Sequence, residues 1–284
     1  MDIPPTAPVT STVEVKAVRI DIVTVAAIAC IGTLCSSFAH EALGHGLFAL
    51  LLGLHPTRLT SVSLDVSLVG VAFWKVKVVA AAGSSMQFVL GLIALWLRRF
   101  VPRQQVHLRF FLWTFSVQSL LMVASYLTVP TLLGYGDWVI FVQGMPASDV
   151  LTIALIALGV VLYVLVFLLC SRALNEFAGW EIQGSNARWR RHARVLYTVY
   201  LTTALINTVS ALFNPTGLGP NAAFAYFGGM APIMLLFSIG NKRRDPTSAS
   251  EEPLTPTRSW PWIIAGLLAA IIQIAVLGPG LPRL

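Results

Sequence analysis

Long apolar stretches with few charges dominate this 284-residue sequence. A helix of about 20 apolar residues is long enough to cross the roughly 30 Å hydrocarbon core of a bilayer. Only 11% of the residues are charged, against about 25% in a typical soluble domain. The pattern therefore predicts an all-α integral membrane protein. About seven transmembrane helices are expected, at residues 22–54, 77–97, 109–133, 149–170, 195–213, 222–240 and 261–279.

The positions of lysine and arginine predict how the chain is oriented. The net charge is +7, but the 19 basic residues cluster between the apolar stretches, so we expect no nucleic-acid partner. When the segments between stretches are assigned to alternating sides of a membrane, 15 basic residues fall on one side and 4 on the other. The positive-inside rule places the richer side in the cytoplasm. We expect a multi-pass protein of a bacterial plasma membrane, with a cytoplasmic N-terminus.

Three ionisable side chains lie close together inside the first apolar stretch. His40 and Glu41 are adjacent, and His45 follows them. Ionisable groups at membrane depth are costly and usually mark a functional site. Two neutral imidazoles are common zinc ligands, and a carboxylate beside them is the usual general base for a zinc-activated water. These residues therefore predict a zinc hydrolase in which His40 and His45 hold Zn²⁺ and Glu41 is the base.

The spacing of the two histidines also makes a structural prediction. In the usual His-Glu-x-x-His arrangement the histidines are four residues apart, whereas His40 and His45 are five apart. Five residues turn an ideal α-helix by about 140° beyond a full turn, which would point the imidazoles to different faces. A π-bulge absorbs one extra residue and restores a shared face. We therefore predict a π-bulge here, where Gly44 offers little steric resistance.

Two segments resemble the site-2-protease-like intramembrane zinc metallopeptidases. Residues 45–53, His-Gly-Leu-Phe-Ala-Leu-Leu-Leu-Gly, resemble the continuation of the active-site helix in that family. Residues 81–88, Ala-Ala-Gly-Ser-Ser-Met-Gln-Phe, resemble its Ala-Gly-Pro-x-x-Asn-Phe segment, with Ser84 for the proline and Gln87 for the asparagine. From the residues alone, Ser84 and Gln87 are expected to serve helix packing. The resemblance covers residues 30–140 and implies a three-helix catalytic core.

The resemblance implies that an aspartate after the third helix is the third zinc ligand. The family's Leu-Asp-Gly motif is absent, and the nearest match is Gly-Tyr-Gly-Asp-Trp at residues 134–138. Asp137 is the only acidic residue between Asp65 and Asp149. We predict Asp137 as the third ligand, with Asp149 and His55 as the substitutes. The residues that bind substrate stay unassigned, although Asn207, Asn214 and Asn221 are candidates for holding a substrate backbone.

These features divide the chain into five predicted regions. Alternating residues at 59–74 predict a short β-hairpin at the membrane surface, which in the resembling family can pair with an extended substrate. The polar, proline-containing residues 241–260 predict a flexible cytoplasmic loop. The regions are a cytoplasmic tail (1–19), the metallopeptidase-like core (20–140), three further transmembrane helices (141–240), the loop (241–260) and a C-terminal transmembrane helix (261–284).

The expected substrate is a transmembrane or membrane-proximal peptide, reached from the lipid bilayer. A membrane zinc hydrolase of a lipid amide or ester is the first alternative. Known seven-helix enzymes of that kind carry a His-x-x-x-His motif in the last helix, and residues 261–279 contain no histidine. The second alternative is a metallopeptidase-like scaffold that binds a membrane partner without catalysis. A buried hydrogen-bonded cluster without metal would be consistent with that scaffold.

Overall fold

The computed structural model describes residues 19–178, 185–215 and 254–282, and most of them are helical. Five helices are long and apolar enough to cross a membrane, and they confirm the first five predicted stretches as helices. The first is continuous through α1 (Ile22–Phe38), η1 (Ala39–Gly46) and α2 (Leu47–Leu51). The other four are α3 (Phe73–Leu97), α4 (Val106–Leu132), α6 (Ser148–Ala178) and α7 (Ser185–Leu212).

The rest of the predicted helix count stays a prediction. The stretch 222–240 lies outside the described residues, as do residues 1–18 of the predicted tail (1–19) and residues 241–253 of the predicted loop. The stretch 261–279 forms α10 (Trp260–Ile271) followed by a π-helical turn, η4 (Ile272–Val276). Together these two elements make an apolar helix, Trp260–Val276, which is shorter than each of the five long helices.

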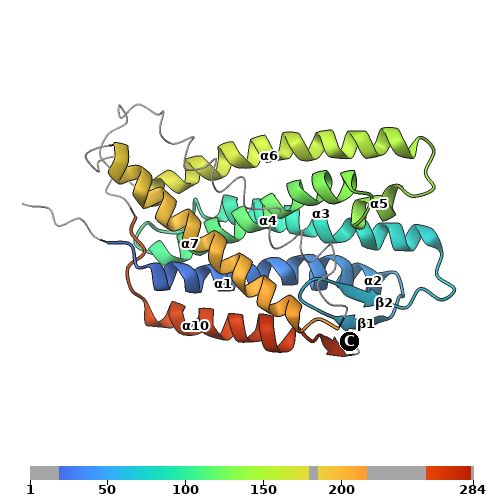
Figure 1. Ribbon diagram of the computed structural model, residues 1–284, viewed down its shortest axis with the longest axis horizontal. Coiled ribbons are helices and arrows are strands. Elements are labelled where there is room, and N and C mark those ends of the chain that lie inside the picture. Colours follow the sequence, from blue (N-terminus) through green and yellow to red (C-terminus); the bar gives the residue numbers. More distant parts are fainter. Residues whose placement is uncertain (1–18, 179–184, 216–253, 283–284) are drawn as a thin grey trace, which may run out of the picture.

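The helices form an elongated bundle in which α1 lies between α10 and the pair α3 and α4 (Figure 1). The largest buried side chains come from α4 and α6, which pack side by side. Phe110 and Trp113 of α4 contact Phe177 of α6, and the indole Nε1 of Trp113 donates to the carbonyl of Cys170 at 3.0 Å. The core of the bundle therefore sits around α4, and it fixes the helix that leads to the candidate site.

The outer face of α6 is apolar but uncovered. Its most apolar segment is only 17% buried, and large side chains such as Ile153, Val161 and Leu165 are about half exposed or more. Soluble monomers rarely expose an apolar patch as large as this one. Such a surface is compatible with a multi-pass membrane protein, in which lipid covers the exposed face.

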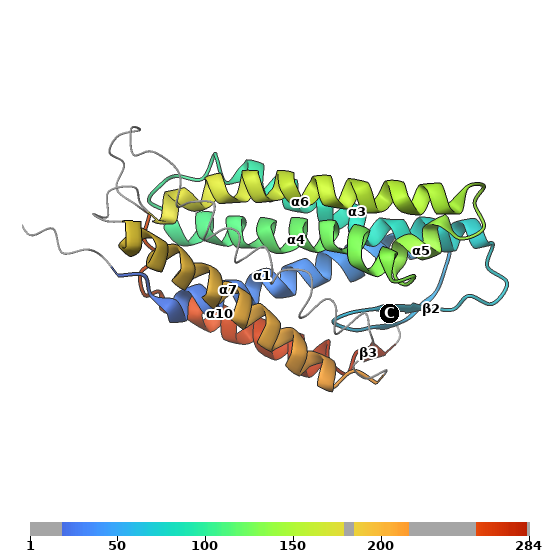
Figure 2. The ribbon, with the colours of Figure 1, turned by 45° about the horizontal axis from the view of Figure 1, so that its top comes forward.

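A small antiparallel sheet lies at one end of the bundle, with the strand order β2-β1-β3 (Figure 2). Strands β1 (Pro56–Leu59) and β2 (Leu64–Val66) form a hairpin, and β3 (Leu281–Pro282) pairs with β1 from the C-terminal end. The predicted bounds of 59–74 were therefore wrong. The hydroxyl oxygen of Thr60 accepts hydrogen bonds from the backbone of Val62 and Ser63 and makes a turn where alternation predicted a strand.

Candidate metal centre

The π-helical segment η1 brings His40 and His45 onto one face. Its backbone hydrogen bonds join residues five apart, as in the bond from the N–H of Leu47 to the carbonyl of Ala42. Residues five apart therefore lie nearly above one another. The Nε2 atoms of the two imidazoles are 3.2 Å apart. The predicted π-bulge is confirmed.

Two glycines allow α3 to approach this segment closely. A Cβ atom at Gly44 would lie 2.5 Å from the Cα of Gly83, so the two backbones touch. A Cβ atom at Gly83 would lie 2.4 Å from Nε2 of His45 and 3.0 Å from Nε2 of His40. The absence of a side chain at Gly83 therefore creates the space into which both imidazoles point.

The chain after α4 turns back toward the histidines and delivers Asp137. Pro130 lacks the N–H that would reach the carbonyl of Tyr126, and the hydroxyl of Thr131 donates to that carbonyl instead. Gly134 and Gly136 then adopt positive φ angles of 79° and 90°, which favour glycine. Asp137 follows as the first residue of the short helix α5 (Asp137–Val142). The turn explains how an aspartate beyond the third long helix reaches a site on the first.

The three predicted ligands meet at one point. Asp137 Oδ2 lies 3.3 Å from His40 Nε2 and 3.4 Å from His45 Nε2. Nitrogen and oxygen atoms bound to zinc at about 2.0–2.2 Å in a tetrahedron are about 3.3–3.5 Å apart. The observed spacing therefore fits three corners of a tetrahedral zinc site. Among the described residues this is the group that could hold a metal ion, and it includes neither Asp149 nor His55.

Hydrogen bonds on the far side of each imidazole orient it for metal binding. His45 Nδ1 lies 2.8 Å from the carbonyl oxygen of Val79, which can only accept, so Nδ1 is the donor. His40 Nδ1 lies 3.0 Å from Oε1 of Gln87. With the protons on Nδ1, both neutral Nε2 atoms present lone pairs to the Asp137 carboxylate. This is the arrangement of metal-binding histidines, and the three atoms lie close enough together to hold a metal ion.

Gln87 holds the imidazole of His40 in place, a contact that the sequence did not predict. Its Nε2 donates to the hydroxyl of Ser36 at 2.8 Å, which leaves Oε1 to accept from His40. Ser119 of α4 donates to the same hydroxyl at 3.2 Å. The resemblance had marked the position of Gln87, but only the facing of α3 and η1 reveals the contact with a ligand. Ser84 is fully buried on α3 and makes no contact with the three ligands in the described interactions.

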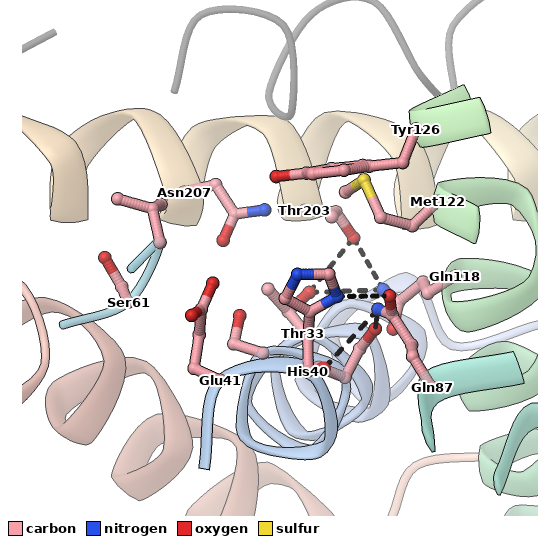
Figure 3. Close-up of a pocket in the computed structure, with 13 residues that line it drawn as sticks. Thr33, His40, Glu41, Ser61, Gln87, Gln118, Met122, Tyr126, Thr203 and Asn207 are labelled. Atoms are coloured by element: carbon pink, nitrogen blue, oxygen red, sulfur yellow. Dashed lines mark hydrogen bonds between the residues drawn. The ribbon is translucent and has the colours of Figure 1, made fainter. Parts of the chain in front are cut away.

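Glu41 lines two cavities beside the predicted ligands. The wide cavity, of about 230 Å³, is lined by the three ligands and by apolar residues of β2, α3 and α5. The small cavity, of about 50 Å³, lies between α1, α4 and α7 and has mostly hydroxyl and amide side chains (Figure 3). Asn207 lines it, while Asn214 instead donates to Thr60 at 3.4 Å and Asn221 lies outside the described residues. The carboxylate of Glu41 is 5% exposed.

Comparison with protein-family models, with curated proteins and with solved structures found no match. The function is therefore inferred from the residues of the site and their geometry.

Proposed function

We propose that this protein is an intramembrane zinc metallopeptidase of the site-2-protease-like kind. The observation that carries the proposal is the convergence of His40 Nε2, His45 Nε2 and Asp137 Oδ2 within 3.2–3.4 Å of one another, beside a buried carboxylate. Each histidine is held by a second hydrogen bond on its other nitrogen, as expected of a ligand.

The chain's own residues supply ligation and proton transfer. His40, His45 and Asp137 would hold Zn²⁺ and leave a fourth position open. A bound zinc ion would polarise the scissile carbonyl and make water easier to deprotonate. Glu41 takes the proton from the attacking water as the new C–O bond forms. It then passes that proton to the leaving amide nitrogen as the C–N bond breaks.

The wide cavity supports an extended peptide as the substrate. Leu64 and Val66 of β2 line it together with the ligands. Strand β1 is paired on both sides, by β2 and β3, whereas β2 has β1 as its only partner in the described sheet. An incoming strand could add to this free edge and lie across the ligands. A helical substrate must unwind there first, because a helix keeps its carbonyls in internal hydrogen bonds.

The charge distribution supports an orientation with the site toward the extracytoplasmic side. The sheet, η1 and α5 lie at one end of the bundle, and the C-terminus of α3 and the start of α10 lie at the other (Figure 1). Basic residues gather at that other end, as the positive-inside rule expects of a cytoplasmic face. They include Arg98, Arg99, Arg103, Arg109, Arg172, Arg190, Arg191, Arg194 and Arg258.

Cleavage of transmembrane peptides in proteoliposomes tests the proposal. Substituting Glu41→Gln should lower the cleavage rate by roughly 10²–10⁴-fold, because the base is removed, while the zinc content stays the same. Fragment masses identify the bond that is cut, and a lipid amide or ester in parallel vesicles tests the other substrate class. Full peptidase activity in Glu41→Gln would remove Glu41 as the base. Lipid cleavage without peptide cleavage would reassign the enzyme.

A further inference from the structure

Buried polar atoms without hydrogen-bond partners gather around the small cavity. Glu41 Oε2, Ser61 Oγ and Gln118 Oε1 belong to side chains that line it, and each residue is at most 5% exposed. A fourth such atom, Gln273 Oε1, belongs to a side chain whose Nε2 donates to Ser37 and Asn207 on the cavity wall. Buried polar groups in folded proteins almost always have partners. This concentration therefore points to an occupant.

The chemistry of these atoms specifies what the occupant must offer. The amide oxygens of Gln118 and Gln273 can only accept hydrogen bonds, because an amide oxygen carries no proton. Ser61 can donate or accept. The occupant must therefore donate hydrogen bonds. An ionised acid has no proton to donate to these amide oxygens, so the occupant is not an acid.

The size of the cavity limits which side chains can occupy it. At about 50 Å³ it has room for roughly three to five water-sized groups, since one water needs about 10–15 Å³. Lysine, arginine and aromatic side chains are too large. Side chains with a carboxamide or a hydroxyl have the right size and the donors. Asparagine, glutamine, serine and threonine fit both conditions.

The small cavity opens beside the point where a substrate would be cut. His40, Glu41, Val62 and Tyr126 line both cavities, and the Glu41 carboxylate faces the space below Asn207 (Figure 3). A peptide lying along β2 in the wide cavity can therefore extend one side chain past Glu41. We propose that the small cavity is a subsite for a neutral, hydrogen-bond-donating side chain next to the scissile bond. This inference rests on the proposed function.

An asparagine scan through a leucine-rich transmembrane peptide tests the subsite. Leucine and asparagine have side chains of the same branched shape, so the exchange changes polarity and, to a smaller extent, helix propensity. Binding is measured by fluorescence anisotropy in nanodiscs with zinc-loaded Glu41→Gln, which keeps an acceptor oxygen and should cleave roughly 10²–10⁴-fold more slowly. At one position of the scan, asparagine should strengthen binding by about tenfold over leucine, from two or three hydrogen bonds. Equal binding at every position would mean that the cavity holds only water and would overturn the proposal.

Two serines of the hairpin region provide a matched pair of variants. The Ser61 side chain makes no hydrogen bond, so Ser61→Val in the Glu41→Gln protein removes an unpartnered hydroxyl and fills the cavity. The tenfold preference should fall to about twofold or less. Ser67→Val, at an exposed position away from the cavity, should leave it unchanged. Ser61→Ala, the gentler change, should lower the preference in the same direction. A preference that survives both Ser61 variants would contradict the subsite.

Cleavage in the otherwise unaltered protein separates this inference from the proposed function. Selective binding without any cleavage would uphold the subsite and refute the peptidase. Cleavage without selectivity for a polar side chain would refute the subsite and uphold the peptidase.

Discussion

Two clusters of ionisable side chains are buried in this bundle, and they are built on opposite principles. At one end of α3, Arg109 donates to Oε2 of Glu176 at 2.9 Å, and Arg98 Nη1 forms an ion pair with the same oxygen at 2.6 Å. About 22 Å away along α3, by helical rise from Gly83 to Arg98, the other cluster holds His40, His45 and Asp137. The first pairs opposite charges. The second brings together three acceptors.

The difference lies in whether protein atoms of opposite charge face one another in the cluster. In the arginine cluster two guanidinium groups face one carboxylate, so protein atoms supply both signs of charge. Arg98 Nε and Nη1 and Arg109 Nε make no hydrogen bond there. In the histidine cluster both Nδ1 protons are directed away, to Gln87 and Val79, so that the lone pairs face inward. A metal ion at the centre would balance them. Burial alone therefore does not distinguish these two clusters, whereas the direction of the donors does.

Removing the carboxylate of the histidine cluster should have the largest effect. Asp137→Ala leaves two ligands, and we expect the zinc content of purified protein to fall from about one per chain to less than about a tenth. Elemental mass spectrometry measures this directly. Asp149→Ala is the matched control and should retain its zinc. Unchanged zinc in Asp137→Ala would send the search for the third ligand to Asp149 or His55.

Removing the hydrogen bond behind one ligand should have a smaller effect on the same quantity. Gln87→Leu leaves His40 without its acceptor, and we expect the zinc affinity to fall by about 10–100-fold, as for other second-sphere partners. Competition with a fluorescent zinc chelator gives the affinity. Gln87→Glu retains an acceptor oxygen and should recover most of the loss. Equal affinities of Gln87→Leu and the unaltered protein would exclude a positioning role.

Disturbing the arginine cluster should change stability alone. Glu176→Gln leaves two guanidinium groups facing a neutral amide, and the cost should be about 1–3 kcal/mol, because the carboxylate is partly exposed. A lower Tm in detergent with an unchanged zinc content is the expected result. Loss of zinc in this variant would show that the two clusters are coupled, and the comparison between them would then fail.

Much of the site could be predicted because its signals are local. The five-residue spacing of His40 and His45 required a π-helical turn, and the turn is present. Asp137 was the only acidic residue near the end of the third stretch. The five long helices follow from apolar content alone.

The remaining features depend on contacts between distant segments, which leave no local pattern. The pairing of Leu281 with Leu59 joins the C-terminal end to the hairpin. Gln87 is separated from His40 by 47 positions, and the small cavity needs side chains from four of the long helices and the hairpin. The hairpin bounds were wrong for a different reason: the hydroxyl turn at Thr60 lies in a run that alternates like a strand.

Zinc content tests the central claim most directly. Detergent-purified protein should contain about one zinc per chain by elemental mass spectrometry, and His45→Ala should contain almost none. That result would establish a metal site on the π-helical turn. Folded protein free of zinc and of any other transition metal, even after incubation with zinc, would contradict the account and favour a scaffold without catalysis.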